Sequence, residues 1–353
     1  MSATFVPGLE LSRRFYGEAV LPILDRHHPG LPHAAARIGW GSDVLGFDTE
    51  MSTDHGWGPI VQMFVRDQDS TLIDSIDELM MRELPEEFLG YPVRFPEPDG
   101  SGPLRHWVQL STVRRYWHDW LGFDIDQPPA TADWLTFPSQ RLGTLTGGAV
   151  HHDGFGELSS LREQLSYYPD DVWLYLMAAG WQRIGQEEHL MPRAGFAGDE
   201  LGSSLIGSRL VREVMRQAFL QERRYAPYAK WLGTAFARLT AATELDPPLR
   251  RVQRAQSWQQ RNAAIGEALE ALARRHNALG VTTSVNEQLT DFFGRPFRRI
   301  SGSDIASVTL AAIADPAIRA LGEGRIIGGV DQFTDSTDLL EAIQLRPVLR
   351  GLY

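Results

Sequence analysis

The stretch Gly41-Ser-Asp-Val-Leu-Gly-Phe-Asp-Thr-Glu-Met-Ser-Thr-Asp-His-Gly-Trp-Gly-Pro59 lies between two short apolar runs, residues 34–40 and Ile60–Val65. The second run is rich in β-branched residues and follows a Gly-Pro turn, which favours a strand. The small apolar residues of the first run fit a strand of the same covered sheet. The sequence therefore predicts two strands joined by a polar loop that carries four carboxylates in 19 residues.

Helical and strand-like patterns continue on both sides of these strands up to about residue 155. Apolar residues recur at helical spacing over residues 8–27 and 71–84, where they form one face of each predicted helix. Residues 106–113 alternate like a half-buried strand and run into a helix over 114–121. Residues 149–154 have the pattern of a last strand. We therefore predict a mixed sheet with flanking helices in the N-terminal part.

The pattern changes after Leu158, where long helical segments begin. We expect an α+β protein with an α/β domain over residues 1–155 and an all-helical bundle domain over residues 156–353. A length of 353 residues exceeds the roughly 250–300 at which a single core stops growing, which supports two domains. Apolar residues at i, i+3 and i+4 predict helices over 172–184, 205–223, 229–242, 253–277, 285–293 and 305–319.

Composition excludes several classes of protein. The chain contains no cysteine, so it has no disulfide, thiolate nucleophile or cysteine-ligated metal. Its net charge of −11 argues against an extended nucleic-acid surface, because binding a phosphate backbone needs a basic stripe. No run of about 18 apolar residues occurs, and residues 1–10 lack the features of a signal peptide. We therefore expect no membrane partner and a cytoplasmic location.

The loop between the first two predicted strands could bind phosphate and metal. Gly41 and Ser42 could present backbone N–H groups to phosphate oxygens where the loop meets a helix N-terminus. Asp54 is predicted to open the next strand, so its carboxylate would project beside them. Mg²⁺-assisted nucleotidyl transfer requires carboxylates next to a phosphate, because this cation takes oxygen ligands. The alternative is an ordinary acidic loop without a ligand.

A Gly-Ser pair followed about ten residues later by Ser-x-Asp is similar to the signature of the nucleotidyltransferase superfamily. The fuller set Pro7–Ser12, Gly41–Asp48, Asp54–Pro59 and Tyr225–Trp231 resembles the bacterial family of domain of unknown function 4037. The resemblance implies a small mixed sheet that holds Mg²⁺ and a nucleoside triphosphate. It also implies a helical domain that closes over the acceptor.

The resemblance assigns positions to individual residues. Gly41, Ser42 and Asp54 match the family pattern. In related enzymes a second acid stands two residues after the first, and a third acid comes from a later strand. Here Gly56 occupies the second position and Gln109 the later strand, and neither is a carboxylate.

Other side chains could supply the missing oxygen ligands, namely Glu50, Asp48 or Asp153. Asp153 belongs to the polar segment His151-His152-Asp153, for which two interpretations remain open. The histidines could form a transition-metal site with Asp54. Alternatively they are solvated residues at a strand end, with Asp153-Gly154 as a turn.

Lys230 is the one lysine among 34 basic side chains. A lysine that persists in such an arginine-rich chain could be needed for its compact ammonium group. The resemblance implies that this ammonium reaches the triphosphate from the helical domain. Alternatively, Tyr225, Tyr228 and Trp231 are packing anchors and the lysine is there by chance.

These observations combine into one leading hypothesis. The protein would be a Mg²⁺-dependent nucleotidyltransferase that moves a nucleoside monophosphate from a nucleoside triphosphate to an unidentified acceptor hydroxyl. The enzyme would act mainly by positioning and by electrostatic stabilisation. The predicted residues are Gly41, Ser42 and Lys230 for the phosphates, Asp54, Glu50 and Asp153 for the metal, and Asp54 and Lys230 for catalysis.

Two further hypotheses stand beside it. Gly56 and Gln109 motivate a pseudoenzyme that binds a nucleotide without turning it over. A metal-dependent hydrolase built on His55, His151 and His152 is the third possibility.

Overall fold

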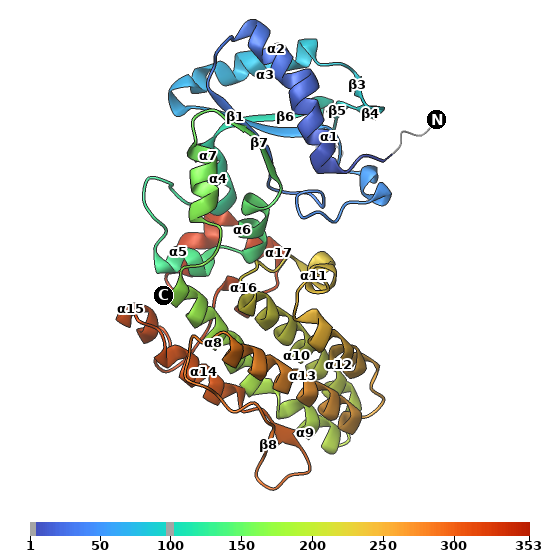
Figure 1. Ribbon diagram of the computed structural model, residues 1–353, viewed down its shortest axis with the longest axis vertical. Helices are drawn as coiled ribbons and strands as arrows, with labels where there is room; N and C mark the ends of the chain where they lie inside the picture. Colours follow the sequence, from blue (N-terminus) through green and yellow to red (C-terminus); the bar gives the residue numbers. More distant parts are fainter. Residues whose placement is uncertain (1–4, 97–101) are drawn as a thin grey trace. The chain divides into compact units, whose positions relative to one another are not determined.

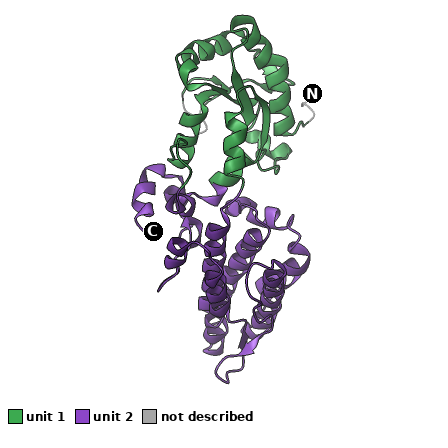
Figure 2. Ribbon diagram, turned by 60° about the vertical axis from the view of Figure 1, so that its left-hand side comes forward, with its two compact units in different colours: residues 1–129, 141–166 green, residues 130–140, 167–353 purple. Residues whose placement is uncertain are grey.

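The computed structural model describes residues 5–96 and 102–353, and the chain divides into two compact units (Figure 2). The first, called the sheet unit, comprises Met1–Pro129 and Arg141–Ser166. The second, called the helical unit, comprises Ala130–Gln140 and Tyr167–Tyr353. Figure 1 shows a sheet with helices in the first unit and a bundle of helices in the second. The predicted α+β class is confirmed.

A five-stranded mixed sheet forms the centre of the sheet unit, in the order β5-β6-β2-β1-β7. β2 runs parallel to β6, and the other neighbouring strands are antiparallel. All side chains of β1 and β2 are buried, which explains why both strands are largely apolar runs in the sequence. The strands are β1 His33–Arg37, β2 Ile60–Val65, β5 Arg94–Phe95, β6 Arg105–Thr112 and β7 Ala149–Asp153.

A continuous helical run over residues 8–27 packs with α3 on the sheet, as Figure 1 shows. The run consists of α1 Gly8–Phe15, a π-helical turn Tyr16–Val20 and α2 Leu21–His27, and α3 spans Ile73–Glu83. Their apolar faces meet the strands in one core that includes Phe15, Leu24, Ala35, Val61, Met63, Ile76 and Met80. The other elements of the unit are the 3₁₀ turns Glu50–Asp54 and Asp67–Leu72, β3 Glu87–Phe88, β4 Tyr91–Pro92, α4 Val113–Leu121 and α7 Glu157–Gln164.

Three long helices build the helical unit: α8 Asp170–Glu187, α10 Glu200–Gln221 and α13 Trp258–Ala278. α8 packs against α10 and α14 Gly302–Ala311, and α10 also packs against α13. Their buried apolar side chains form one core. Shorter helices are α5 Thr131–Thr136, α9 Leu190–Phe196, α11 Ala229–Phe236, α12 Ala242–Arg254, α15 Pro316–Ala320, α16 Val330–Phe333, α17 Thr337–Glu341 and α18 Arg346–Arg350; the residues of α6 Ser139–Thr146 are divided between the units.

Some predicted helices differ from those observed. The helix predicted over 229–242 ends at Phe236, and the separate helix α12 begins at Ala242. The helix predicted over 285–293 is wrong, because Thr290–Asp291 (β8) pairs with Arg298–Arg299 (β9) in a short hairpin. Val285 and Leu289 of this segment pack on the core of the helical unit, and Phe292 stacks on Phe297 at 5.8 Å. The second unit is therefore helical apart from this hairpin.

The boundary between the units also differs from the predicted one at residues 155/156. The sheet unit continues to Ser166 because α7 packs against β7. Residues 130–140 join the helical unit, since α5 packs against α8 and α18. The change of periodicity in the sequence marks where helices begin, and the first of these helices belongs to the sheet unit.

Candidate functional site

A buried ion pair anchors the loop between β1 and β2. Arg37, the last residue of β1, donates from Nε and Nη2 to the two carboxylate oxygens of Asp43, at 2.7 and 2.8 Å. Both side chains are buried, so this bidentate pair is shielded from water. Gly41 has a φ of +130°, and a Cβ atom there would clash with Asp43 Oδ1 and Arg37 Nη2. The ion pair therefore requires glycine at this position.

Gly41 and Ser42 lie in a turn, so the predicted helix N-terminus at this point is wrong. The Phe47 N–H donates to the Ser42 carbonyl and the Gly46 N–H to the Asp43 carbonyl, both at 2.9 Å. Among residues 5–96 and 102–353, no hydrogen bond uses the N–H groups of Gly41 or Ser42. These two neighbouring N–H groups could meet an anion, because successive unpaired amides in a turn suit phosphate oxygens.

Asp54 and Glu50 lie on the exposed 3₁₀ turn Glu50–Asp54, so the prediction that Asp54 opens the next strand is wrong. β2 begins only at Ile60. Thr49 begins this turn with a capping box, which explains why the chain turns here instead of extending. The Asp54 carboxylate is 60% exposed and lies 2.9 Å from Nδ1 of His55. Both carboxylates thus remain accessible to solvent.

The other candidate acids have structural partners. At the end of β7, Asp153 accepts hydrogen bonds from the Gly156 N–H at 2.9 Å and from the Ser159 N–H at 2.8 Å, so it caps the start of α7. Asp48 Oδ2 accepts from the Gly8 N–H at 2.7 Å and from Trp57 Nε1 at 3.1 Å. These contacts occupy oxygens that a metal ion would need.

Two amides stand at the centre of the sheet next to this loop. Gln62 of β2 and Gln109 of β6 are register partners, and Gln62 Nε2 donates to Gln109 Oε1 at 2.8 Å. Gln62 is fully buried, and its Oε1 accepts from the Ile38 N–H at 3.0 Å. Gln62 is not among the residues predicted from the sequence, although a single polar residue within the apolar run Ile60–Val65 is a usable signal.

The carboxylates of Asp54, Glu50 and Asp153 do not form a metal site in this arrangement. In the part of the chain that the structure describes, no group of three or more His, Asp or Glu side chains is placed to hold a metal ion. Gln109, on β6, stands where the resemblance implies a carboxylate, and its amide is neutral. The residues present therefore do not fit a two-metal centre, and binding of Mg²⁺ stays a prediction.

The three histidines of the hydrolase hypothesis lie in different surroundings. His151 is partly buried, and its Nε2 lies 2.9 Å from Oγ of Ser12. Burial lowers the pKa of His151 to about 4, so the ring is neutral near pH 7. The ring of His152 contacts that of His33 at 4.6 Å, whereas His55 is 81% exposed beside Asp54. Each histidine thus has contacts of its own.

Lys230 lies at the start of α11, in the helical unit, whereas Gly41, Ser42 and Asp54 belong to the sheet unit. Its side chain is exposed, and Nζ lies 5.0 Å from the centre of the Trp231 ring. This geometry is a cation–π contact at a solvated surface, worth about 0.5–1 kcal/mol. The structure thus shows Lys230 in contact with Trp231. A role of Lys230 in binding phosphate stays a prediction.

The comparisons with known proteins identify one segment. No curated protein and no solved structure is similar enough to match. Residues 134–232 match the family model described as "Domain of unknown function (DUF4037)". This segment runs from α5 into α11 and includes Asp153 and Lys230, but not the loop of Gly41 and Ser42. The match supports the resemblance to this family over residues 134–232, which include the motif Tyr225–Trp231.

Proposed function

We propose that the sheet unit binds a nucleoside triphosphate at the loop of Gly41 and Ser42 and does not transfer its nucleotide. The observation that carries this proposal is the Gln62–Gln109 amide pair at the centre of the sheet. The Gly-Ser loop after the first strand and the mixed sheet agree with a nucleotidyltransferase-like frame. The unpaired N–H groups of Gly41 and Ser42 offer donors to phosphate oxygens.

The Gln62–Gln109 amide pair argues against nucleotidyl transfer but not against nucleotide binding. Transfer of a nucleotidyl group needs negative oxygens that hold cations against the developing charge. A glutamine amide is neutral, and the amides of Gln62 and Gln109 are already bonded to each other. Binding of the triphosphate does not need these negative oxygens, because backbone N–H groups can bind phosphate oxygens without a metal ion.

The test is a pair of measurements on the whole protein with each of the four nucleoside triphosphates. We expect thermal stabilisation of about 2.7 kcal/mol at a nucleotide concentration 100 times the dissociation constant. We expect no release of pyrophosphate, with or without Mg²⁺. If none of the four nucleotides stabilises the protein, the proposal of nucleotide binding is wrong. If pyrophosphate is released, the proposal that no nucleotide is transferred is wrong.

A transferase is the second candidate, and the exposure of Asp54 and Glu50 favours it. In that case Asp54 and Glu50 of the sheet unit would supply oxygen ligands for Mg²⁺, and an acceptor hydroxyl would take the nucleoside monophosphate. The substitution Asp54→Asn would then abolish pyrophosphate release and leave the melting temperature unchanged, because the side chain is exposed and keeps its shape. Retention of release in this variant would count against the transferase.

A further inference from the structure

The helical unit contains a small cavity between α5, α8, α10 and α16. Its volume is about 50 Å³, and apolar and aromatic side chains form most of its wall. Because a water molecule needs roughly 10–15 Å³ of such space, the cavity has room for only about four water-sized groups. The lining residues used below are Trp134, Phe137, Tyr168, Arg216, Arg224 and Asp331.

The aromatic part of the wall is held in a fixed geometry. The ring of Trp134 meets the rings of Phe137 and Tyr168 edge to face, at centroid distances of 6.1 and 5.9 Å. Trp134, Phe137 and Tyr168 are all buried, so their rotamers are restricted by packing. A ligand would therefore meet a preformed apolar surface, which lowers the entropy lost on binding.

The charged residues of the wall differ in whether they have hydrogen-bond partners. Arg216 donates from Nη1 to the backbone carbonyl of Asp331, and Asp331 Oδ2 accepts from the Ser139 N–H at 2.8 Å. In the described ranges, by contrast, no hydrogen bond or ion pair involves the guanidinium of Arg224. The neighbouring Arg223 pairs with Asp170 at 2.6 Å.

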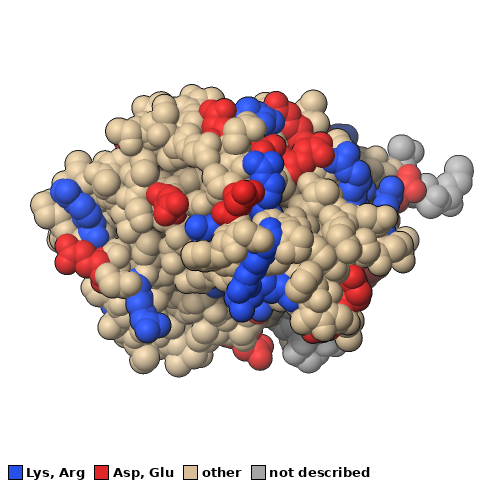
Figure 3. Space-filling view, turned by 90° about the horizontal axis from the view of Figure 1, so that it is seen from below, with Lys and Arg blue, Asp and Glu red and all other residues tan. Residues whose placement is uncertain are grey.

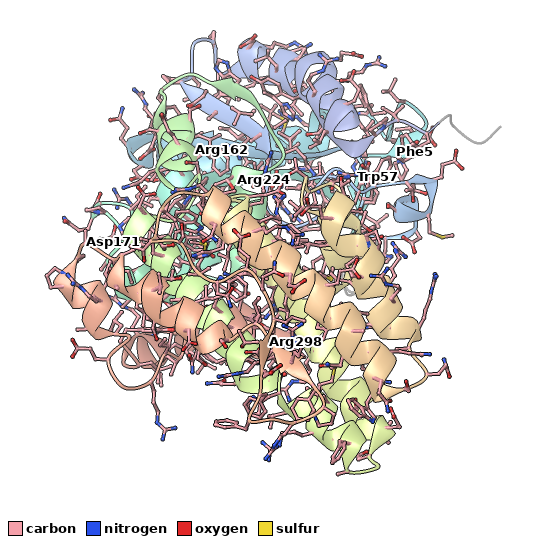
Figure 4. The ribbon with its side chains drawn as sticks, turned by 60° about the horizontal axis from the view of Figure 1, so that its bottom comes forward. Phe5, Trp57, Arg162, Asp171, Arg224 and Arg298 are labelled. Carbon is pink, nitrogen blue, oxygen red and sulfur yellow. The ribbon has the colours of Figure 1, made fainter. Side chains whose placement is uncertain are left out.

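Arg224 follows the end of α10 and is labelled in Figure 4. Its side chain lines the cavity and also reaches solvent, so the guanidinium is accessible to a ligand at the mouth. A planar guanidinium binds a carboxylate by two parallel hydrogen bonds. The cavity thus offers one unpaired bidentate donor next to an apolar wall.

The charges of the lining indicate the charge of the ligand. Two arginines and one aspartate give a formal sum of +1. Burial raises the pKa of Asp331, so its carboxyl group adds less negative charge than a solvated one. A monoanion balances this lining, whereas a doubly charged phosphate would bring excess negative charge next to Asp331.

We propose that this cavity binds a small monocarboxylate with an apolar tail. The carboxylate lies against the guanidinium of Arg224, and the tail enters between Trp134, Phe137 and Tyr168. A tail of a few carbon atoms fills the available volume, and a nucleotide is too large for it. The lining residues from Trp134 to Ala226 fall within the matched segment 134–232, so most of this site belongs to the DUF4037 region. The proposal is independent of nucleotide binding by the sheet unit.

Ligand-observed NMR titrations of the full chain test it, with butyrate and benzoate as probes and with butyramide and inorganic phosphate as controls. Butyramide has the tail without the charge, and phosphate has the charge without the tail. We expect butyrate to bind at least about tenfold more tightly than either control, since only butyrate combines the charge for Arg224 with the apolar tail. Equal binding of butyrate and butyramide, or tighter binding of phosphate, overturns the proposal. Benzoate binding more weakly than butyrate is expected from the small volume.

Two variants locate the site. Arg224→Gln should weaken butyrate binding about tenfold without loss of fold, because Arg224 is exposed. Arg193→Gln is the matched control, since Arg193 is an exposed arginine on α9 that does not line this cavity. Ala226→Leu, which adds a side chain to the wall, should abolish binding of butyrate. If Arg224→Gln and Arg193→Gln bind butyrate equally well, the assignment to this cavity is wrong.

Discussion

Single buried side chains determine how the helical unit responds to pH, and Glu188 is one of them. Its side chain lies in the core with 2% of its surface exposed. The two carboxylate oxygens accept hydrogen bonds from the N–H groups of Ile300, at 2.7 Å, and Gly302, at 2.9 Å. Glu188 thus holds the chain where α14 begins. Burial outweighs these bonds and raises the pKa of Glu188 to about 7.

The raised pKa predicts a loss of stability as pH increases. Between the unfolded value of about 4.5 and the folded value of about 7, the folded state binds more protons than the unfolded state. The free energy of unfolding therefore falls as pH rises through this window, by up to about 3 kcal/mol. Urea denaturation at pH 5 and pH 8 measures it. Glu188→Gln should reduce this pH dependence, and an unchanged slope in the variant would assign it to other groups.

His276 acts in the opposite direction. It is fully buried, and its Nδ1 accepts a hydrogen bond from Trp181 Nε1 at 3.2 Å, which places the ring proton on Nε2 beside Thr282. Burial lowers the pKa of His276 to about 4. The unfolded state binds more protons between pH 6.5 and 4, so stability is lost as pH falls through this window. Denaturation of His276→Gln at pH 6.5 and 4.5 should show a smaller difference than wild type; an equal difference contradicts the assignment.

At the scale of elements, the start of α7 gives a test of one predicted metal ligand. Asp153→Ala removes the acceptor of the Gly156 N–H, just before α7, and of the Ser159 N–H in its first turn, so we expect a loss of about 1–2 kcal/mol in the stability of the sheet unit. Asp153→Asn keeps a capping oxygen and should cost much less. Nucleotide affinity, measured with and without Mg²⁺, should not change in either variant. A large loss of Mg²⁺-dependent affinity in Asp153→Asn, without loss of stability, would restore Asp153 as a ligand.

Elements were predictable from local patterns where one face or both faces are buried. The apolar run Ile60–Val65 is a strand with these bounds, and the helical spacing over residues 8–27 is one continuous helical run. Prediction failed over 285–293, where part of the segment pairs in a hairpin while Val285 and Leu289 pack on the helical core. Spacing alone cannot distinguish the two arrangements in so short a segment.

The candidate site was less predictable because its contacts join distant parts of the sequence. Gln62 and Gln109 meet only through the parallel pairing of β2 and β6. Asp48 bonds to Gly8, forty positions earlier in the sequence. Sequence patterns identify which residue types are present, but such pairings decide which carboxylates remain unbonded. Asp48 and Asp153 have hydrogen-bond partners while Asp54 and Glu50 are exposed, and a role of these acids as metal ligands stays a prediction.

At the scale of the whole molecule, the distribution of charged side chains can be followed on one face. Basic and acidic side chains are interspersed on the face drawn in Figure 3, without a continuous basic stripe there. Among the helices of residues 5–96 and 102–353, each is too short or too polar to cross a bilayer. Neither the surface charge nor the helix lengths indicate which ligand binds. Nucleotide binding by the sheet unit and carboxylate binding by the helical unit therefore need separate tests.

The two units should respond separately to their two ligands, because each buries a core of its own. At 100 times its dissociation constant, a nucleoside triphosphate should raise the free energy of unfolding of the sheet unit alone by about 2.7 kcal/mol. Butyrate should do the same for the helical unit alone. Scanning calorimetry measures both transitions. Two variants at fully buried positions identify the transitions. Ile76→Ala should destabilise the sheet unit, and Leu272→Ala the helical unit, each by about 2–5 kcal/mol. If either ligand raises both transitions equally, the units unfold as one, and their binding sites are thermodynamically coupled.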